Sequence, residues 1–117
     1  MTQPPLPQPD VDQINLANVL AALGDQTRLA IIGHLARDEA HGMTCGQFTD
    51  LASKTGITYH VARLREAGVV RVQPEGTRRR VILRRGDLDS RFPGFLDSII
   101  ASAGEPPPLD GYDASDE

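Results

Sequence analysis

The stretch SKTGITYHVARLREAGVVRVQPEGTRRRVIL, residues 53–83, changes its hydrophobic period half-way along. In its first half, Ile57, Val61 and Leu64 recur at the spacing of one face of an α-helix. Gly68 follows, and glycine is a typical helix stop because it adopts left-handed backbone angles without steric cost. The first half therefore predicts a helix that begins after Ser53 and ends at Gly68.

The second half has the composition of a β-hairpin. Residues 69–72 and 81–83 are rich in valine, isoleucine and leucine, and residues 74–77 read Pro-Glu-Gly-Thr, a turn by composition. Two short β-rich runs around such a turn predict an antiparallel pair of strands.

Three further helices are predicted upstream. Residues 14–23 are apolar at helical spacing and end at Gly24, and Asp25 is a candidate cap for a second helix. Thr44 and Gln47 have the spacing of a capping box that starts a third helix. The apolar residues that this third helix would bury are Phe48, Leu51 and Ala52.

After the hairpin, a turn at residues 87–88 leads to a last helix with Pro93 as its first residue. The predicted order is helix, helix, helix, helix, strand, strand, helix, which is mainly α with a small β-hairpin. Two short helices joined by a turn and followed by a hairpin form a winged helix-turn-helix.

Charge divides the chain into a basic centre and acidic ends. The formal net charge is −4, yet residues 53–85 hold nine basic and two acidic side chains, and residues 104–117 hold five acidic and no basic ones. We expect an unstructured arm over residues 1–10, a winged-helix domain with a basic centre suited to DNA over 11–103, and an unstructured acidic tail over 104–117.

Several function classes do not fit the composition. The longest apolar runs are too short to cross a bilayer, and the N-terminus lacks a signal region, so we expect neither a membrane span nor secretion. A single cysteine, Cys45, fits a reducing cytoplasm and excludes a zinc site built from several cysteines of one chain. The sequence has no glycine-rich phosphate loop, and Cys45 has no evident base, so an enzyme is not expected.

The face of the 53–68 helix opposite its apolar residues carries small hydroxyl groups, which allow close approach to DNA and can bond phosphates or base edges. Alternation along the hairpin sends Arg79 to the face opposite Arg78 and Arg80. The alternative is that these arginines only keep an edge strand from aggregating. The predicted DNA-binding residues are Ser53, Lys54, Thr55, Thr58, Tyr59, Arg63, Arg78, Arg79 and Arg80.

Four segments resemble one family of bacterial regulators. The stretch ALGDQTRLAII (22–32) is similar to the usual LADPTRLRIL, and LREAGVV (64–70) is similar to LREAGLV. EGTRRR (75–80) and FPGFL (92–96) resemble the wing and the final helix of one branch. These segments occur in the family's order and are identified as those of an ArsR/SmtB-type winged helix-turn-helix transcriptional regulator.

The resemblance implies a cytoplasmic homodimer, a repressor by family default, whose two recognition helices enter successive major grooves of an inverted repeat. It also implies that the first and last helices form the dimer interface. The residues that this assigns to the interface are Leu16, Val19, Leu20, Leu23, Phe95, Leu96, Ile99 and Ile100.

Some members of the family that this chain resembles sense metals. In this chain the corresponding metal site is incomplete, because TCGQ (44–47) offers a single thiol. The candidate ligands for nickel or zinc are His34, Asp38, His41 and Cys45. The sequence favours the alternative, in which His34 ends a helix, His41 lies in a loop and Cys45 is a small buried apolar residue.

Two functions from different classes remain. The first is a sequence-specific DNA-binding regulator whose acidic tail competes with DNA phosphates for the basic centre. The second is a protein-interaction module on the same fold, or a corepressor-type regulator that needs a second regulatory protein.

Overall fold

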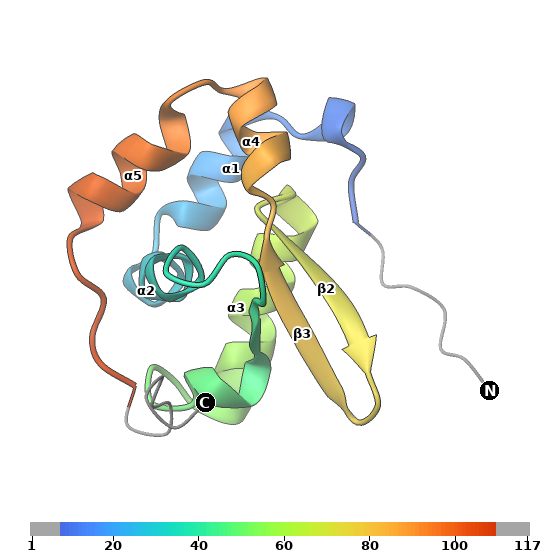
Figure 1. Cartoon of the computed structure of the whole chain (residues 1–117), viewed down its shortest axis with the longest axis vertical. Helices are drawn as coiled ribbons and strands as arrows, with labels where there is room; N and C mark the ends of the chain where they lie inside the picture. Colours follow the sequence, from blue (N-terminus) through green and yellow to red (C-terminus); the bar gives the residue numbers. More distant parts are fainter. Residues whose placement is uncertain (1–7, 110–117) are drawn as a thin grey trace.

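Residues 8–109, the part of the chain that the computed structural model describes, form a group of helices with a small sheet beside them, whose hairpin projects from the helices (Figure 1). This architecture confirms the predicted fold class, which is mainly helical with a hairpin after the longest helix. The elements in chain order are the 3-10 helix η1 (Val11–Gln13), α1 (Leu16–Leu23), α2 (Gln26–Leu35), β1 (Met43–Thr44), the 3-10 helix η2 (Cys45–Phe48), α3 (Lys54–Ala67), β2 (Val70–Glu75), β3 (Arg78–Leu83), α4 (Arg85–Arg91) and α5 (Phe95–Ala103).

Both ends of α3 follow from the residues that cap it. The Ser53 hydroxyl accepts a hydrogen bond from the Gly56 amide at 3.0 Å, which satisfies one of the free donors of the first turn. At the other end Gly68 has a φ of 86°, in the left-handed region. A Cβ added to Gly68 would lie 2.6 Å from Cγ1 of Ile14, so the N-terminal segment also packs closely against this turn.

The sheet has the strand order β1-β3-β2, and both pairings are antiparallel. β2 and β3 form the predicted hairpin, with Val72 opposite Val81 and Val70 opposite Leu83. β1 adds a third strand in which Met43 pairs with Val81. This strand was not predicted from the sequence, because two residues are too few to show a period.

A side chain covers the outer edge of β2. The Oε1 atom of Gln8 accepts from the Val72 amide at 2.9 Å, and its Nε2 donates to the Val72 carbonyl at 3.3 Å. The Gln8 amide thus makes the two hydrogen bonds that a neighbouring strand would make at this position.

The core lies where α1, α2 and α3 meet the sheet, and aliphatic side chains dominate it. Its largest fully buried side chains are Phe48, Ile14, Ile31, Ile32, Leu35, Ile57, Leu64, Leu88, Leu96, Val19, Val69 and Val70.

The predicted third helix is shorter than expected. Its capping box is present, with Gln47 Oε1 accepting from the Thr44 amide at 2.9 Å, but only Cys45–Phe48 is helical, as a 3-10 turn. Gly46 in this first turn weakens a regular helix because glycine loses the most backbone entropy on ordering. Phe48 is nevertheless buried, as predicted.

The predicted start of the last helix at Pro93 is wrong. Gly94 has a φ of 78°, which reverses the chain, so helical angles begin only at Phe95. The turn predicted at residues 87–88 is instead part of α4 (Arg85–Arg91), whose first turn carries Asp87.

The boundaries of the folded domain also need correction, because it extends beyond Ala103. His34 Nε2 lies 2.6 Å from the Pro107 carbonyl oxygen, Arg37 pairs with Glu105 at 2.7 Å, and Leu109 is only 7% exposed. Residues 104–109 therefore run from α5 alongside α2 rather than forming part of an unstructured tail (Figure 1). Burial of the imidazole lowers the pKa of His34, which favours its neutral form in this contact.

The N-terminal boundary shifts in the same way, since residues 8–10 contact the fold. Besides the Gln8 bonds, the Pro9 carbonyl accepts from Arg84 Nη1 at 2.7 Å. The remainder of the predicted arm and tail, 1–7 and 110–117, lies outside the described residues.

Gly68→Ala is expected to lower the free energy of unfolding by about 1–3 kcal/mol, because alanine is strained at this φ and its Cβ would meet Ile14. Urea denaturation followed by circular dichroism measures the change. The matched control is Gly86→Ala in α4, where nothing lies within 4 Å of an added Cβ and alanine favours the helix. Equal stability of the two variants would contradict the steric role of Gly68.

Candidate nucleic-acid interface

α3 presents a polar face to solvent. Ile57, Val61 and Leu64 are buried in the core, whereas Thr55 and Tyr59 are exposed, the latter by 57%. The helix thus divides into the two faces that the sequence predicts. Chemically, the solvent face offers hydroxyl groups that donate and accept hydrogen bonds, with little bulk in the first turns.

The first turns of this face are also well ordered by local hydrogen bonds. The Thr58 hydroxyl donates to the Lys54 carbonyl at 3.1 Å, while Ser53 holds the cap of the helix. Ser53, Lys54 and Thr58 are all exposed to solvent.

A buried arginine fixes α3 against α2. Arg28 Nη1 lies 2.9 Å from His60 Nδ1, and Arg28 Nε donates to the Ala22 carbonyl at the end of α1. Asp25 caps α2 by accepting from the Arg28 amide at 3.0 Å, and this bond lowers the pKa of the Asp25 carboxyl. One side chain therefore connects α1, α2 and α3, and it ties the start of α2 to the middle of α3.

The hairpin arginines divide as the strand alternation predicts. Arg79 pairs with Pro74, on the face that carries Val72 and Val81, whereas Arg80 pairs with Gln73 on the opposite face. Arg79 therefore projects from the side of the hairpin that packs against α3.

Arg80, one of the three arginines predicted to bind DNA, has partners within the chain. Its guanidinium bonds both carboxylate oxygens of Glu75, at 2.8 and 3.1 Å, and donates to the His41 carbonyl at 3.0 Å. The bond from Arg80 also lowers the pKa of Glu75. Arg80 thus stabilises the hairpin, a role that single-residue alternation does not predict.

Three basic side chains, unlike Arg80, make no salt bridge within the described residues. Among residues 8–109, the side chains of Lys54, Arg78 and Arg79 make no salt bridge and no hydrogen bond, whereas Arg63 pairs with Glu66 at 3.8 Å. The other arginines contact a carboxylate, a carbonyl or a histidine. Lys54 and Arg79 therefore lie where α3 faces the hairpin, while Arg78, at the start of β3, projects from the face that carries Arg80.

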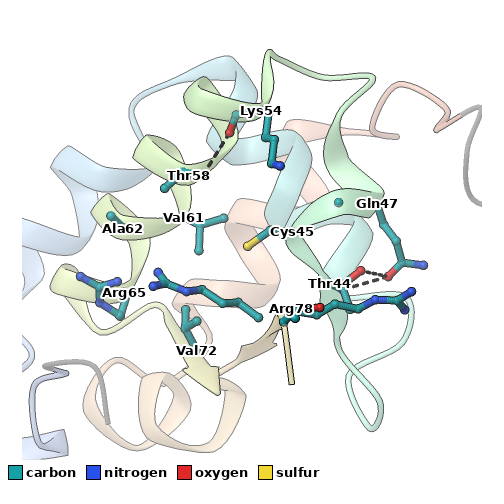
Figure 2. A pocket seen from close by; sticks show the side chains of 13 residues that line it. Thr44, Cys45, Gln47, Lys54, Thr58, Val61, Ala62, Arg65, Val72 and Arg78 are labelled. Atoms are coloured by element: carbon teal, nitrogen blue, oxygen red, sulfur yellow. Dashed lines mark hydrogen bonds between the residues drawn. The ribbon is translucent and has the colours of Figure 1, made fainter. Parts of the chain in front are cut away.

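The space between these elements is a cavity of about 630 Å³ (Figure 2). Arg65 was not singled out from the sequence as a functional residue, although Lys54, Thr58, Ala62 and Arg65 follow one another at helical spacing along one stripe of α3. The cavity is lined by Thr44, Cys45, Gly46, Gln47, Lys54, Thr58, Val61, Ala62, Arg65, Val72, Thr77, Arg78 and Arg79.

The residues expected at the dimer interface are not all on the surface. Val19, Leu23 and Leu96 are buried within the single chain, so they have no surface to offer a second copy. Leu16 and Leu20 lie one turn apart on α1 and are 43% and 47% exposed. The remaining residues, which are partly buried, are Phe95, Ile99 and Ile100.

The four candidate metal ligands do not come together in the chain. His34 faces Pro107, while His41 Nδ1 lies 2.7 Å from Asp38 Oδ1. Cys45 instead lines the cavity beside α3, and within the described range no group of three or more histidine, cysteine or acidic side chains is placed to hold a metal ion. The alternative of structural roles for these residues agrees with the fold.

None of the helices in residues 8–109 combines the length and apolar composition that crossing a membrane requires.

Comparison with known proteins agrees with this geometry. Residues 23–73, from the end of α1 to the middle of β2, match the family described as the helix-turn-helix domain. The uncharacterized HTH-type transcriptional regulator YceK of Bacillus subtilis (strain 168) is 34% identical over 90 residues, which cover 75% of this chain and 88% of that relative. With a hairpin directly after α3, the chain belongs to the ArsR-like winged helix-turn-helix transcriptional regulators rather than to an enzyme family.

Proposed function

We propose that this protein represses transcription by occupying an operator in duplex DNA as a homodimer. α3 enters the major groove with the hydroxyl groups of Thr55, Thr58 and Tyr59 towards the base edges and phosphates. The hairpin lies over the neighbouring backbone and minor groove with Arg78 and Arg79.

The observation that carries this proposal is that three cations without a salt bridge in residues 8–109 line the space between α3 and the tip of the hairpin. Lys54, Arg78 and Arg79 have no salt bridge or hydrogen bond within the described part of the chain, while the other arginines do. A cation kept free of internal partners is able to neutralise a DNA phosphate and release its counterions. The word "regulator" in the name of the Bacillus relative is consistent with this role.

A homodimer is supported by the exposed leucines of α1. Leu16 and Leu20 are large apolar residues on the side of α1 that the core leaves uncovered. A second copy related by a two-fold axis would cover them and place two copies of α3 about one duplex turn apart, which suits an inverted repeat. A metal response is not part of the proposal, because the candidate ligands are dispersed.

Replacing Arg78 and Arg79 together by glutamine is expected to weaken binding to duplex DNA at least about tenfold at low salt. The slope of log affinity against log salt should become shallower by about one for each phosphate that the variant no longer neutralises. Fluorescence anisotropy with a mixed-sequence duplex of about 30 base pairs, long enough for two half-sites, measures both quantities.

The matched control is Arg71→Gln, which removes an arginine of the same hairpin that pairs with Asp87 at 3.9 Å. It should leave affinity and salt slope nearly unchanged. Equal losses in both variants would indicate a non-specific effect of charge, and absence of DNA binding by the native protein would favour a protein-interaction module.

Leu20→Glu is expected to convert the dimer to a folded monomer, because it places a charge in a surface that a second copy must bury. Sedimentation velocity gives the mass and circular dichroism checks the fold. Gln73→Glu, an exposed change of β2, should remain dimeric. A native protein that sediments as a monomer at micromolar concentration would refute the dimer.

Deleting residues 110–117, which contain four acidic side chains, is expected to tighten DNA binding by about three- to tenfold at low salt and have little effect at high salt. The truncation begins after Leu109, because residues 104–109 pack on α2 and their loss would disturb the fold. A full-length variant with the four acids changed to amides should match the deletion. Unchanged affinity in both variants would discard competition by the tail.

A further inference from the structure

The cavity between α3, η2 and the hairpin has an apolar floor beneath its cationic rim. Val61 and Val72 at its floor are only 3% and 2% exposed, and Ala62 adds a third apolar surface (Figure 2). A phosphate strand on the outside of the molecule would meet the cations at the rim without filling this floor. At about 630 Å³ the cavity falls in the size range of small-molecule sites.

The rim of the cavity selects for negative charge. Lys54, Arg78 and Arg79 contribute charges that have no salt bridge or hydrogen bond in residues 8–109. Arg65 adds a largely buried guanidinium, whose Nη2 lies 3.9 Å from Oε2 of Glu66. In the part of the chain that the structure describes, no acidic side chain lines the cavity.

Neutral polar groups complete the lining. Thr44, Gln47 and Thr77 can orient a polar substituent, while Cys45 behaves as a small uncharged surface, since burial raises the pKa of its thiol. Cations at the rim, hydrogen-bonding groups on the walls and an apolar floor are complementary to a molecule with an anionic end and an apolar body.

We propose that this cavity binds a small amphipathic organic anion, a carboxylate, sulfonate or phosphate carried on an apolar body, and that the bound anion excludes DNA. The inference rests on the proposed function, because the bound anion excludes DNA only if both ligands use the same cations. An anion held by Lys54 and Arg79 neutralises the charges that would otherwise bind phosphates of the duplex. The protein thereby becomes a regulator that releases its operator when this class of molecule accumulates.

The probe is the fluorescent dye anilinonaphthalene sulfonate, which has an anionic group on an aromatic body. Cys45, the only cysteine of the chain, reports whether the dye occupies this cavity, because a bound molecule should slow alkylation of the thiol by uncharged N-ethylmaleimide. We expect saturable fluorescence and protection of Cys45 with the same concentration dependence. Fluorescence without protection would mean that the dye binds elsewhere, and would overturn the proposal.

Two variants test separately how much the cations and the apolar floor contribute to dye binding. Arg79→Gln should weaken dye binding at least about tenfold, whereas Arg71→Gln, outside the cavity, should not. Ala62→Leu keeps every cation and fills part of the hollow, so it should also lose the dye while remaining folded by circular dichroism. Inorganic phosphate should protect Cys45 far less than the dye; equal protection would indicate a patch that binds any anion and would overturn the proposal.

Competition with DNA completes the test. A mixed-sequence duplex should displace the dye from the native protein, and the dye should weaken DNA binding in proportion to its occupancy. Simultaneous binding of both would overturn the exclusion. DNA binding measured without dye is a separate readout: normal DNA binding with no dye protection refutes the cavity ligand alone, and dye protection without DNA binding refutes the proposed function.

Discussion

The turn at Gly68 is the constraint on which the rest of the structure depends. α3 ends there because this residue is in the left-handed region, with a φ of 86°, and Ile14 packs where a side chain would otherwise stand. The direction in which β2 leaves the helix is therefore fixed by a steric condition rather than by a flexible link. Because of it, Lys54 on α3 and Arg79 on the hairpin face the same cavity, although they are far apart in sequence.

The distribution of ion pairs separates structural from functional charge. Arg84 pairs with Asp87 at 2.8 Å, Arg85 with Glu39 at 2.9 Å, and Arg91 donates to the Ile14 carbonyl, so these arginines hold the segments around α4 together. The hydrogen bonds from Arg85 to Glu39 are the main reason that the pKa of Arg85 is raised. The net charge of −4 hides this division, since it counts paired and unpaired groups alike.

Much of the fold could be predicted from sequence because its signals are local. The Ser53 cap, the Gly68 stop and the alternation that places Arg79 opposite to Arg80 each depend on neighbours in the chain. The features that were missed depend on distant residues: β1 exists only through pairing with β3, and Arg80 is bound partly by the His41 carbonyl. The metal hypothesis also relied on residues that are close in sequence. The fold does not bring Cys45 together with the histidines, so the hypothesis has no support in the described residues.

The Gln8 side chain has a consequence for self-association of the protein through the edge of its sheet. β2 is an outer strand of the sheet, rich in valine, and such strands are templates on which other chains assemble into fibrils. By occupying both backbone groups of Val72, the amide interrupts that template at its centre. A residue that precedes the first helix thus protects the sheet edge against pairing with another chain at this position.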